Sequence, residues 1–248
     1  YIAVTGVQTC ALPIFLTNIE QVVFGKTEVV RLCVVGLLAR GHLLIEDVPG
    51  IGKTTIAQAL ARSLDCAFAR IQFTSDMLPS DILGVSILEP GGHDFRFRPG
   101  PIFASVVLAD EINRTPPKTQ SALLEAMSEY QVSVDGKPHA LPRPFIVLAT
   151  QNPIEYEGTY LLPESQLDRF MLRIDIGYPP AADELRIMRR RDPGLALEQL
   201  EPVLTAEDLL ALQGLVGDVT VEDSVAEYML AIVQGTRDHE HIRLGASP

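Results

Sequence analysis

The sequence has a deficit of basic residues and very little cysteine. Its 248 residues include 20 Lys and Arg against 32 Asp and Glu, which gives a net charge of -12 at pH 7. Such a chain repels bulk nucleic acid, so a protein or small-ligand partner is favoured and a nucleic-acid partner is not expected. The three cysteines, Cys10, Cys33 and Cys66, form no CxxC pair, which argues against a disulfide framework or a zinc site.

Long apolar runs and targeting signals are missing as well. The longest apolar run lies between Arg31 and Arg40, well short of the roughly 20 residues that a membrane helix needs. We find no signal peptide, with its basic start and small-residue cleavage site, and therefore expect a cytoplasmic protein without membrane insertion. The composition, 47% hydrophobic and 21% charged, is that of a globular protein and excludes disorder or a collagen-like chain.

The chain divides into three parts by the character of its sequence. Residues 4–14 resemble a translated sequencing adaptor, so residues 1–14 are expected to be foreign to the protein. Residues 15–178 alternate apolar runs with helical patterns, as one domain would. Helical patterns alone fill residues 179–248, which predicts a second, helical domain.

Short apolar runs predict five buried strands, at 42–46, 68–73, 106–109, 145–149 and 172–176. Helical spacing at 54–64 and 119–130 falls between them. Strands that alternate with helices predict an α/β fold, with a parallel sheet covered on both faces. Ligands of such sheets bind at the carboxyl ends of the strands. Two further segments, 84–97 and 131–141, carry turn signals that predict β-hairpins projecting from the sheet.

A phosphate-binding loop is predicted directly after the first strand. Residues 47–54 match the last three positions of the pattern GxxxxGK[ST], with Asp47 in place of the first glycine. An ordinary strand-to-helix turn is the alternative, but the strand–loop–helix context favours a phosphate site.

The residues of this loop fit the chemistry of phosphate binding. Gly50 and Gly52 let the backbone approach phosphate oxygens, and the helix N-terminus contributes positive partial charge. Lys53 is placed to reach the β- and γ-phosphates, and Thr54 to ligate Mg²⁺.

Polar residues end two later strands. Asp110 and Glu111 follow the strand at 106–109, where Asp110 would hold Mg²⁺ and Glu111 would orient and deprotonate an attacking water. This pair favours hydrolysis over transfer to another substrate, the alternative being a solvated pair of acidic residues. Asn152 follows the strand at 145–149 and would position water or sense the γ-phosphate, with a plain turn residue as the alternative.

These motifs together resemble those of MoxR-type AAA+ ATPases. The matching stretches are 41–54, 110–127, 149–153, 162–170 and 244–248. The resemblance implies a P-loop NTPase fold, a three-layer αβα sandwich with a five-stranded parallel sheet and a C-terminal helical lid. In the family a sensor-2 arginine follows the Gly-Ala-Ser-Pro sequence at 245–248, so we expect the lid to be truncated here.

The resemblance also assigns roles to single residues, with ATP and Mg²⁺ as cofactors. Asp110 and Glu111 correspond to the Walker B pair, Asn152 to sensor 1, and Arg169 to an arginine finger that reaches the nucleotide of a neighbouring subunit. Taken alone, Arg169 would be a structural ion-pair residue. The nucleotide-binding positions are Val22, Val23, Pro49, Gly50, Ile51, Gly52, Lys53, Thr54 and Thr55. Of these, Val22 and Val23 correspond to positions near adenine, and core packing is their alternative role.

The function implied by the resemblance is ATP-driven, chaperone-like remodelling or maturation of other proteins. It implies a homo-oligomeric ring, usually a hexamer, with von Willebrand factor A domain proteins or client enzymes as partners. A nucleotide-dependent binding scaffold with little turnover and a magnesium-chelatase-like motor subunit are the alternatives. The acidic charge argues against a nucleic-acid motor.

Overall fold

A five-stranded parallel sheet forms the centre of the fold. The computed structural model describes residues 6–48, 50–89, 94–152, 159–189, 193–242 and 245–246. The strands of the sheet are β1 (His42–Glu46), β2 (Phe68–Gln72), β5 (Val106–Asp110), β8 (Ile146–Gln151) and β9 (Phe170–Ile174). They lie in the order β2-β5-β8-β1-β9, and all neighbouring strands run parallel. The predicted parallel sheet is confirmed.

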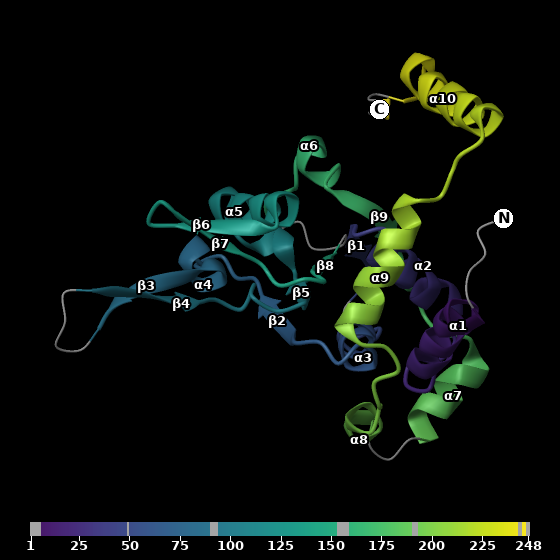
Figure 1. Cartoon of the computed structure of the whole chain (residues 1–248), viewed down its shortest axis with the longest axis horizontal. Coiled ribbons are helices and arrows are strands. Elements are labelled where there is room, and N and C mark those ends of the chain that lie inside the picture. Colours follow the sequence, from purple (N-terminus) through teal and green to yellow (C-terminus); the bar gives the residue numbers. More distant parts are fainter. Residues whose placement is uncertain are drawn as a thin grey trace. The chain divides into compact units, whose positions relative to one another are not determined.

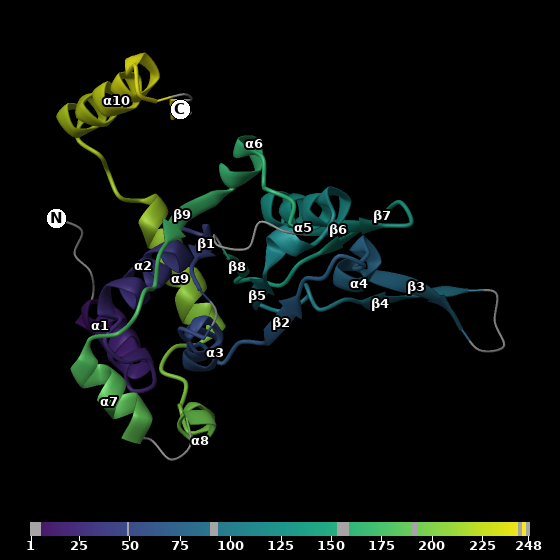
Figure 2. The same cartoon turned by 180° about the vertical axis from the view of Figure 1, so that it is seen from behind.

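Helices cover both faces of this sheet. Successive strand residues point to opposite sides, so apolar strands present an apolar surface on each face that must be buried. One face is covered by α1 (Gly6–Glu20), α2 (Thr27–Leu38), α3 (Lys53–Ser63) and part of α9 (Ala206–Gly217), the other by α4 (Pro79–Leu83) and α5 (Pro117–Glu129). In β1, Leu43 and Ile45 belong to the first core, whereas Leu44 between them belongs to the second. The predicted three-layer sandwich is therefore confirmed, and Figures 1 and 2 show it from front and back.

The two predicted hairpins are present as separate antiparallel sheets. They consist of β3 (Gly84–Leu88) with β4 (Phe95–Pro99), and of β6 (Gln131–Val134) with β7 (Lys137–Ala140). Asp135 and Gly136 form the second turn with φ of 52° and 75°, which matches the Asp-Gly signal. The predicted turn of the first hairpin, at 90–92, lies outside the described residues. Both views show β3 and β4 extending away from the central sheet (Figures 1 and 2).

The N-terminal segment forms a helix that the sequence analysis left out. Helix α1 includes residues 6–14 and continues to Glu20. Within it, Leu12 packs against the first core, and Phe15 and Ile19 are fully buried there. The fold thus extends into the segment that resembles an adaptor, whose foreign origin stays a prediction.

Contacts divide the chain into two compact units, residues 1–213 and 214–248. The C-terminal helices are α7 (Ala181–Arg189), α8 (Pro193–Glu198), α9 and α10 (Asp223–Asp238). The predicted boundary after residue 178 does not coincide with this division, because α7, α8 and most of α9 belong to the unit of the sheet. Leu200 and Leu209 lie in the first core, and the N–H groups of Val203 and Leu204 donate to Ser63 O at 3.0 and 3.2 Å.

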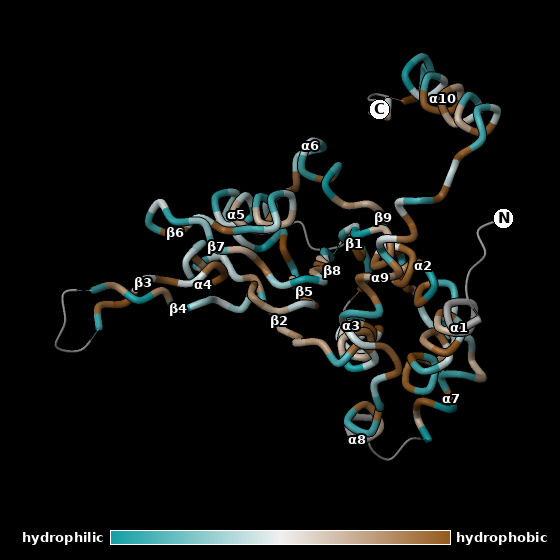
Figure 3. Tube along the Cα trace, in the orientation of Figure 1, coloured by the Kyte–Doolittle hydropathy of each residue, from teal (hydrophilic) through white to brown (hydrophobic). Residues whose placement is uncertain are grey.

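The helices differ from one another in hydropathy (Figure 3). The trace in Figure 3 is brown along much of α9, whereas α6 (Glu164–Leu167) is teal. Among the described residues, no helix combines the length and the apolar character needed to cross a membrane.

Candidate functional site

The loop between β1 and α3 has the backbone that the glycine pattern predicts. Gly50 and Gly52 have φ of +87° and +95°, a region that residues with a side chain rarely adopt. A Cβ added to either glycine would meet no atom within 4 Å, so the space beside this loop is open. Pro49, the remaining predicted loop residue, lies outside the described residues.

Lys53 begins α3 directly after this loop, and Thr54 and Thr55 follow it in the first turn. The Lys53 ammonium group is half-buried and donates to the carbonyl oxygen of Asp47 at 2.5 Å. Burial lowers the pKa of Lys53, while the negative charges of Asp110, Asp47 and Glu111 act to raise it. The lysine therefore lies within electrostatic reach of the predicted acidic pair.

Asp110 ends β5 and is held from two sides. Its Oδ1 accepts a hydrogen bond from the hydroxyl group of Thr150 at 2.6 Å, and its Oδ2 forms an ion pair with Arg70 at 2.5 Å. These partners come from the neighbouring strands β8 and β2. The sequence analysis missed both residues, because their proximity depends on how the strands pair.

Glu111 has an unusual backbone conformation, with φ of 59° and ψ of 49°. Its N–H group donates to the Thr150 hydroxyl at 2.9 Å, and its Oε2 accepts from Gln72 at 2.8 Å and from Arg114 at 3.0 Å. Such left-handed conformations in residues other than glycine cost energy and are concentrated at functional sites. The surrounding contacts therefore fix the direction of a carboxylate that lies beside Asp110.

Asn152 follows β8, which lies between β1 and β5 in the sheet. The residue is buried, with 7% exposure. This order places Asn152 between the glycine loop that follows β1 and the acidic pair that ends β5. The structure thus brings Lys53, Asp110, Glu111 and Asn152 to the carboxyl edge of the sheet, where ligands of parallel sheets are expected.

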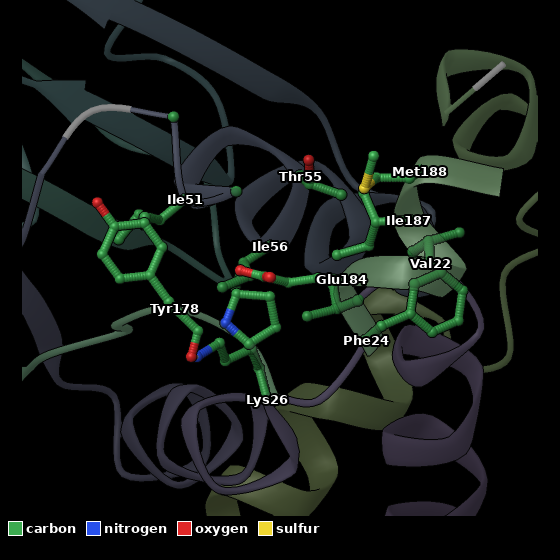
Figure 4. A pocket seen from close by; sticks show the side chains of 14 residues that line it. Val22, Phe24, Lys26, Ile51, Thr55, Ile56, Tyr178, Glu184, Ile187 and Met188 are labelled. Carbon is green, nitrogen blue, oxygen red and sulfur yellow. The ribbon is translucent and has the colours of Figure 1, made fainter. Parts of the chain in front are cut away.

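A cavity of about 570 Å³ opens beside the glycine loop. Small-molecule sites typically have volumes of about 300–1,000 Å³. The cavity is lined by Val22, Val23, Phe24, Lys26, Gly50, Ile51, Gly52, Thr55, Ile56, Tyr178, Pro179, Glu184, Ile187 and Met188. In Figure 4, Val22, Phe24 and Met188 lie on one side of it, and Tyr178 and Ile51 on the other.

The predicted nucleotide-binding residues divide between this cavity and the adjacent loop. Those that line the cavity are Val22, Val23, Gly50, Ile51, Gly52 and Thr55. The sequence analysis missed the wall formed by α7, although Glu184, Ile187 and Met188 recur at helical spacing and so share one helix face. For this part of the chain the sequence predicted only a domain boundary after residue 178.

Arg169 lies apart from the cavity, between α6 and β9. Its side chain is exposed, and Nη1 donates to Leu124 O at 2.6 Å and to the Ser128 hydroxyl at 2.7 Å. Both partners belong to α5. The guanidinium group is therefore positioned on the surface of α5 and does not line the cavity of its own chain.

The site fits a nucleoside triphosphate and a hard cation. The open glycine loop and the Lys53 ammonium group suit phosphate oxygens, and the largely apolar cavity suits a base. Oxygen donors suit Mg²⁺, and two are close to Lys53: the hydroxyl of Thr54, the next residue of α3, and the carboxylate of Asp110 at the end of β5.

Comparisons of sequence agree with this chemistry. A sequence model of the ATPase family associated with various cellular activities (AAA) matches residues 42–172. The chain is 53% identical over 231 residues to protein YeaC of Bacillus subtilis, across 93% of this chain and 72% of that protein. It is 42% identical over 240 residues to Chaperone MoxR1 of Mycobacterium tuberculosis, across 93% of this chain and 63% of that protein. The chain thus spans only part of the length of these relatives.

A solved structure has a similar fold. A crystal structure of a candidate ATPase from Cytophaga hutchinsonii superimposes with a TM-score of 0.84 at 40% sequence identity. The match covers 92% of this chain and 69% of the other.

Proposed function

The chain belongs to the ATPase family associated with various cellular activities, in its MoxR branch, and we propose that it binds ATP at the loop and cavity beside α3 and hydrolyses it. The observation that carries this proposal is the meeting of four predicted residues at one edge of the sheet. The carboxylates of Asp110 and Glu111 and the amide of Asn152 come from the ends of β5 and β8, and the Lys53 ammonium group comes from the start of α3.

In this proposal each part of the site has a distinct task. The backbone at Gly50 and Gly52 and the Lys53 ammonium group bind the phosphates, which leaves the apolar cavity for the base. Mg²⁺, when bound, neutralises phosphate charge, and Thr54 and Asp110 are the residues that would hold it. Asn152 is placed to orient the terminal phosphate or the attacking water.

Glu111 is the residue that would activate the water. Its carboxylate accepts the proton as the water oxygen attacks the terminal phosphorus and the bond to the β-phosphate oxygen breaks. Gln72 and Arg114 hold the carboxylate in one direction, and Thr150 fixes the backbone that carries it. Orientation of this kind supplies much of the rate of phosphoryl transfer.

We propose further that the chain acts as a ring, with Arg169 completing the site of a neighbouring subunit. What supports this is the exposed position of Arg169 on α5, outside the cavity of its own chain. An arginine supplied in trans stabilises charge on the transferred phosphoryl group and raises the rate by about 10³–10⁵ in other enzymes. By similarity to Chaperone MoxR1, we propose remodelling or maturation of partner proteins as the outcome. The resemblance of the motifs to those of MoxR-type ATPases suggests von Willebrand factor A domain proteins as candidate partners.

The test is the ATPase rate per subunit as a function of protein concentration, for the wild type and for Arg169→Ala. We expect the wild-type rate to rise with concentration as subunits assemble, and the variant to lose about a hundredfold or more at every concentration. Ser128→Ala is the control, because it removes one contact of Arg169 but keeps the guanidinium group. A wild-type rate that stays near zero at all concentrations, with ATP bound, would contradict hydrolysis and leave a nucleotide-dependent scaffold.

A further inference from the structure

The segment that joins β9 to α7 passes directly along the cavity. We name residues 176–178 the strap. Ile176 is buried with 4% exposure, Gly177 has φ of +62°, and Tyr178 lines the cavity. The positive φ of Gly177 turns the chain at this point, so the direction in which α7 begins depends on how the strap is held.

Lys26 holds the strap from one side. Its ammonium group donates to the carbonyl oxygens of Ile176 and Tyr178, each at 2.7 Å. One cation thus binds the two carbonyl groups that flank Gly177. Hydrogen bonds from a charged donor are stronger than those between neutral groups, so this contact fixes the strap firmly.

Asp47 holds the strap from the other side. Its Oδ2 accepts the N–H group of Gly177 at 2.5 Å, and its Oδ1 accepts the N–H group of Val48 at 2.7 Å. The carbonyl oxygen of the same residue accepts from Lys53 at 2.5 Å. A single residue of the phosphate loop therefore contacts both the strap and the lysine of the loop. A glycine, the residue of the strict loop pattern, has no side chain to make the contact with the strap.

The strap in turn positions the α7 wall of the cavity. Pro180 O accepts the N–H groups of Asp183 and Glu184 at 2.8 and 3.0 Å, which starts the helix directly after the strap. Beyond this point, Glu184, Ile187 and Met188 line the cavity together with Tyr178. A displacement of the strap would therefore move the whole α7 wall that faces the proposed base.

We infer that Asp47 and Lys26 are positioning residues that clamp the strap, and that through this clamp the phosphate loop fixes the wall of the base pocket. The inference rests on the proposed binding of ATP in this cavity. Asp47 then does more than occupy the first position of the loop, because its carboxylate couples the phosphate end of the site to the base end. Lys26 acts on the same strap without contacting the phosphate loop.

The first experiment is amide hydrogen exchange of the full chain without nucleotide, for Asp47→Gly and Lys26→Met. Glycine suits the loop pattern, and methionine keeps the apolar stem of the lysine, so both variants are expected to fold. We expect exchange of the peptide that covers the strap and the start of α7 to be about tenfold faster in each variant. Asp65→Gly is the control, because it makes the same change at an exposed residue whose φ of 50° glycine adopts readily.

The second experiment is calorimetric titration of the same proteins with ATP and with inorganic tripolyphosphate, both with Mg²⁺. In Lys26→Met, loss of the clamp should weaken ATP binding by about tenfold and change tripolyphosphate binding by less than about twofold, because only ATP has a nucleobase. In Asp47→Gly, which also removes a negative charge that acts on Lys53, ATP binding should weaken relative to tripolyphosphate binding by a similar factor. Asp47→Asn keeps one acceptor oxygen and should show a smaller loss. The double variant should bind ATP only slightly more weakly than the single variant with the lower ATP affinity, because both residues act through one strap.

Each outcome separates the inference from the proposed function. Wild-type protein that does not bind ATP would overturn the proposed function, while the exchange experiment would still test the clamp. Normal strap exchange in Asp47→Gly, or equal losses for ATP and tripolyphosphate, would overturn the clamp and leave ATP binding intact.

Discussion

The two ends of the central strands both hold buried polar groups, but they use them in different ways. At the amino end, His42 begins β1 and is 4% exposed. Its Nδ1 accepts the N–H group of Val147 at 3.0 Å, so its Nε2 carries the proton and donates to Met127 O at 3.1 Å. Both ring nitrogens are satisfied by backbone groups, and Tyr130 and Phe145 pack around the ring.

At the carboxyl end the polar groups are charged and converge on one another. Lys53, Asp110 and Glu111 lie within electrostatic reach of each other, and Thr150 bridges the two acidic residues. This end opens onto a cavity, whereas the ring of His42 is enclosed. The difference shows that burial of a polar group does not by itself mark a site. The distinguishing features are net charge, an unusual backbone conformation and adjacent open space.

The largest effect is expected when Glu111, the proposed general base at the carboxyl end of the strands, is replaced. Glu111→Gln keeps the shape of the side chain but cannot accept a proton, so turnover should fall by about a thousandfold while ATP affinity stays within about twofold. Steady-state ATPase rates and calorimetry measure the two quantities. Turnover within about a factor of two of the wild type would exclude Glu111 as the base.

Removal of the loop lysine should act on binding instead. Lys53→Ala deletes the ammonium group beside the glycine loop, and we expect ATP affinity to fall by about a hundredfold in calorimetric titration. His42→Gln is the control from the amino end of β1, the strand that leads into the glycine loop, and its ATP affinity should match the wild type. Unchanged affinity in Lys53→Ala would remove this residue from the site.

The three inner strands β1, β5 and β8 could be predicted because strands buried on both faces are continuous apolar runs. The β9 prediction was shifted by two residues, since its start at Phe170 is set by pairing with His42 rather than by local pattern. Helix α2 was missed because its apolar stretch was tested only as a membrane span. Helix α1 was missed because most of it lies in the segment that resembles an adaptor.

The site was predictable where its residues are close in sequence and unpredictable where they meet across strands. The loop and the acidic pair are local patterns. By contrast, Gln72 reaches Glu111 only because β2 pairs with β5 in a register that sets Gln72 opposite Asp110. Thr150 depends in the same way on the pairing of β5 with β8. No local signal carries such information, because it arises from long-range packing.

The enclosed character of His42 predicts a pH effect on folding. Burial lowers the pKa of His42 from 6.5 to about 4, and the hydrogen bond to Met127 O opposes this only in part. Between these values the unfolded chain binds a proton that the folded chain does not, so stability falls as pH drops from 6.5 toward 4. The loss amounts to about 3 kcal/mol. His42→Gln should lose this part of the pH dependence.

Denaturant unfolding of both proteins at a series of pH values measures this effect. The other titrating groups are common to both, so their contribution cancels in the difference between the two curves. Parallel curves between pH 6.5 and 4 would show that His42 takes up its proton equally in both states.

The smallest effect is expected when Thr150, which bridges Asp110 and Glu111, is replaced. Thr150→Val keeps the volume of this fully buried side chain but removes the hydroxyl that accepts from Glu111 N–H and donates to Asp110. The N–H group of Glu111 is then left without this acceptor, so stability should fall by about 1–3 kcal/mol. Turnover should fall by about tenfold as the direction of Glu111 is relaxed.

Thr119→Val separates these two effects. Thr119 is also buried, and its hydroxyl donates to Met77 O at 2.8 Å, away from the acidic pair. The control should lose similar stability in denaturant unfolding but keep its ATPase rate. Equal turnover in the two variants would mean that Thr150 serves only the fold, and the carboxyl end would then resemble the amino end in this respect. A loss of turnover confined to Thr150→Val would show that a neutral buried hydroxyl belongs to the site because of the charged groups it aligns.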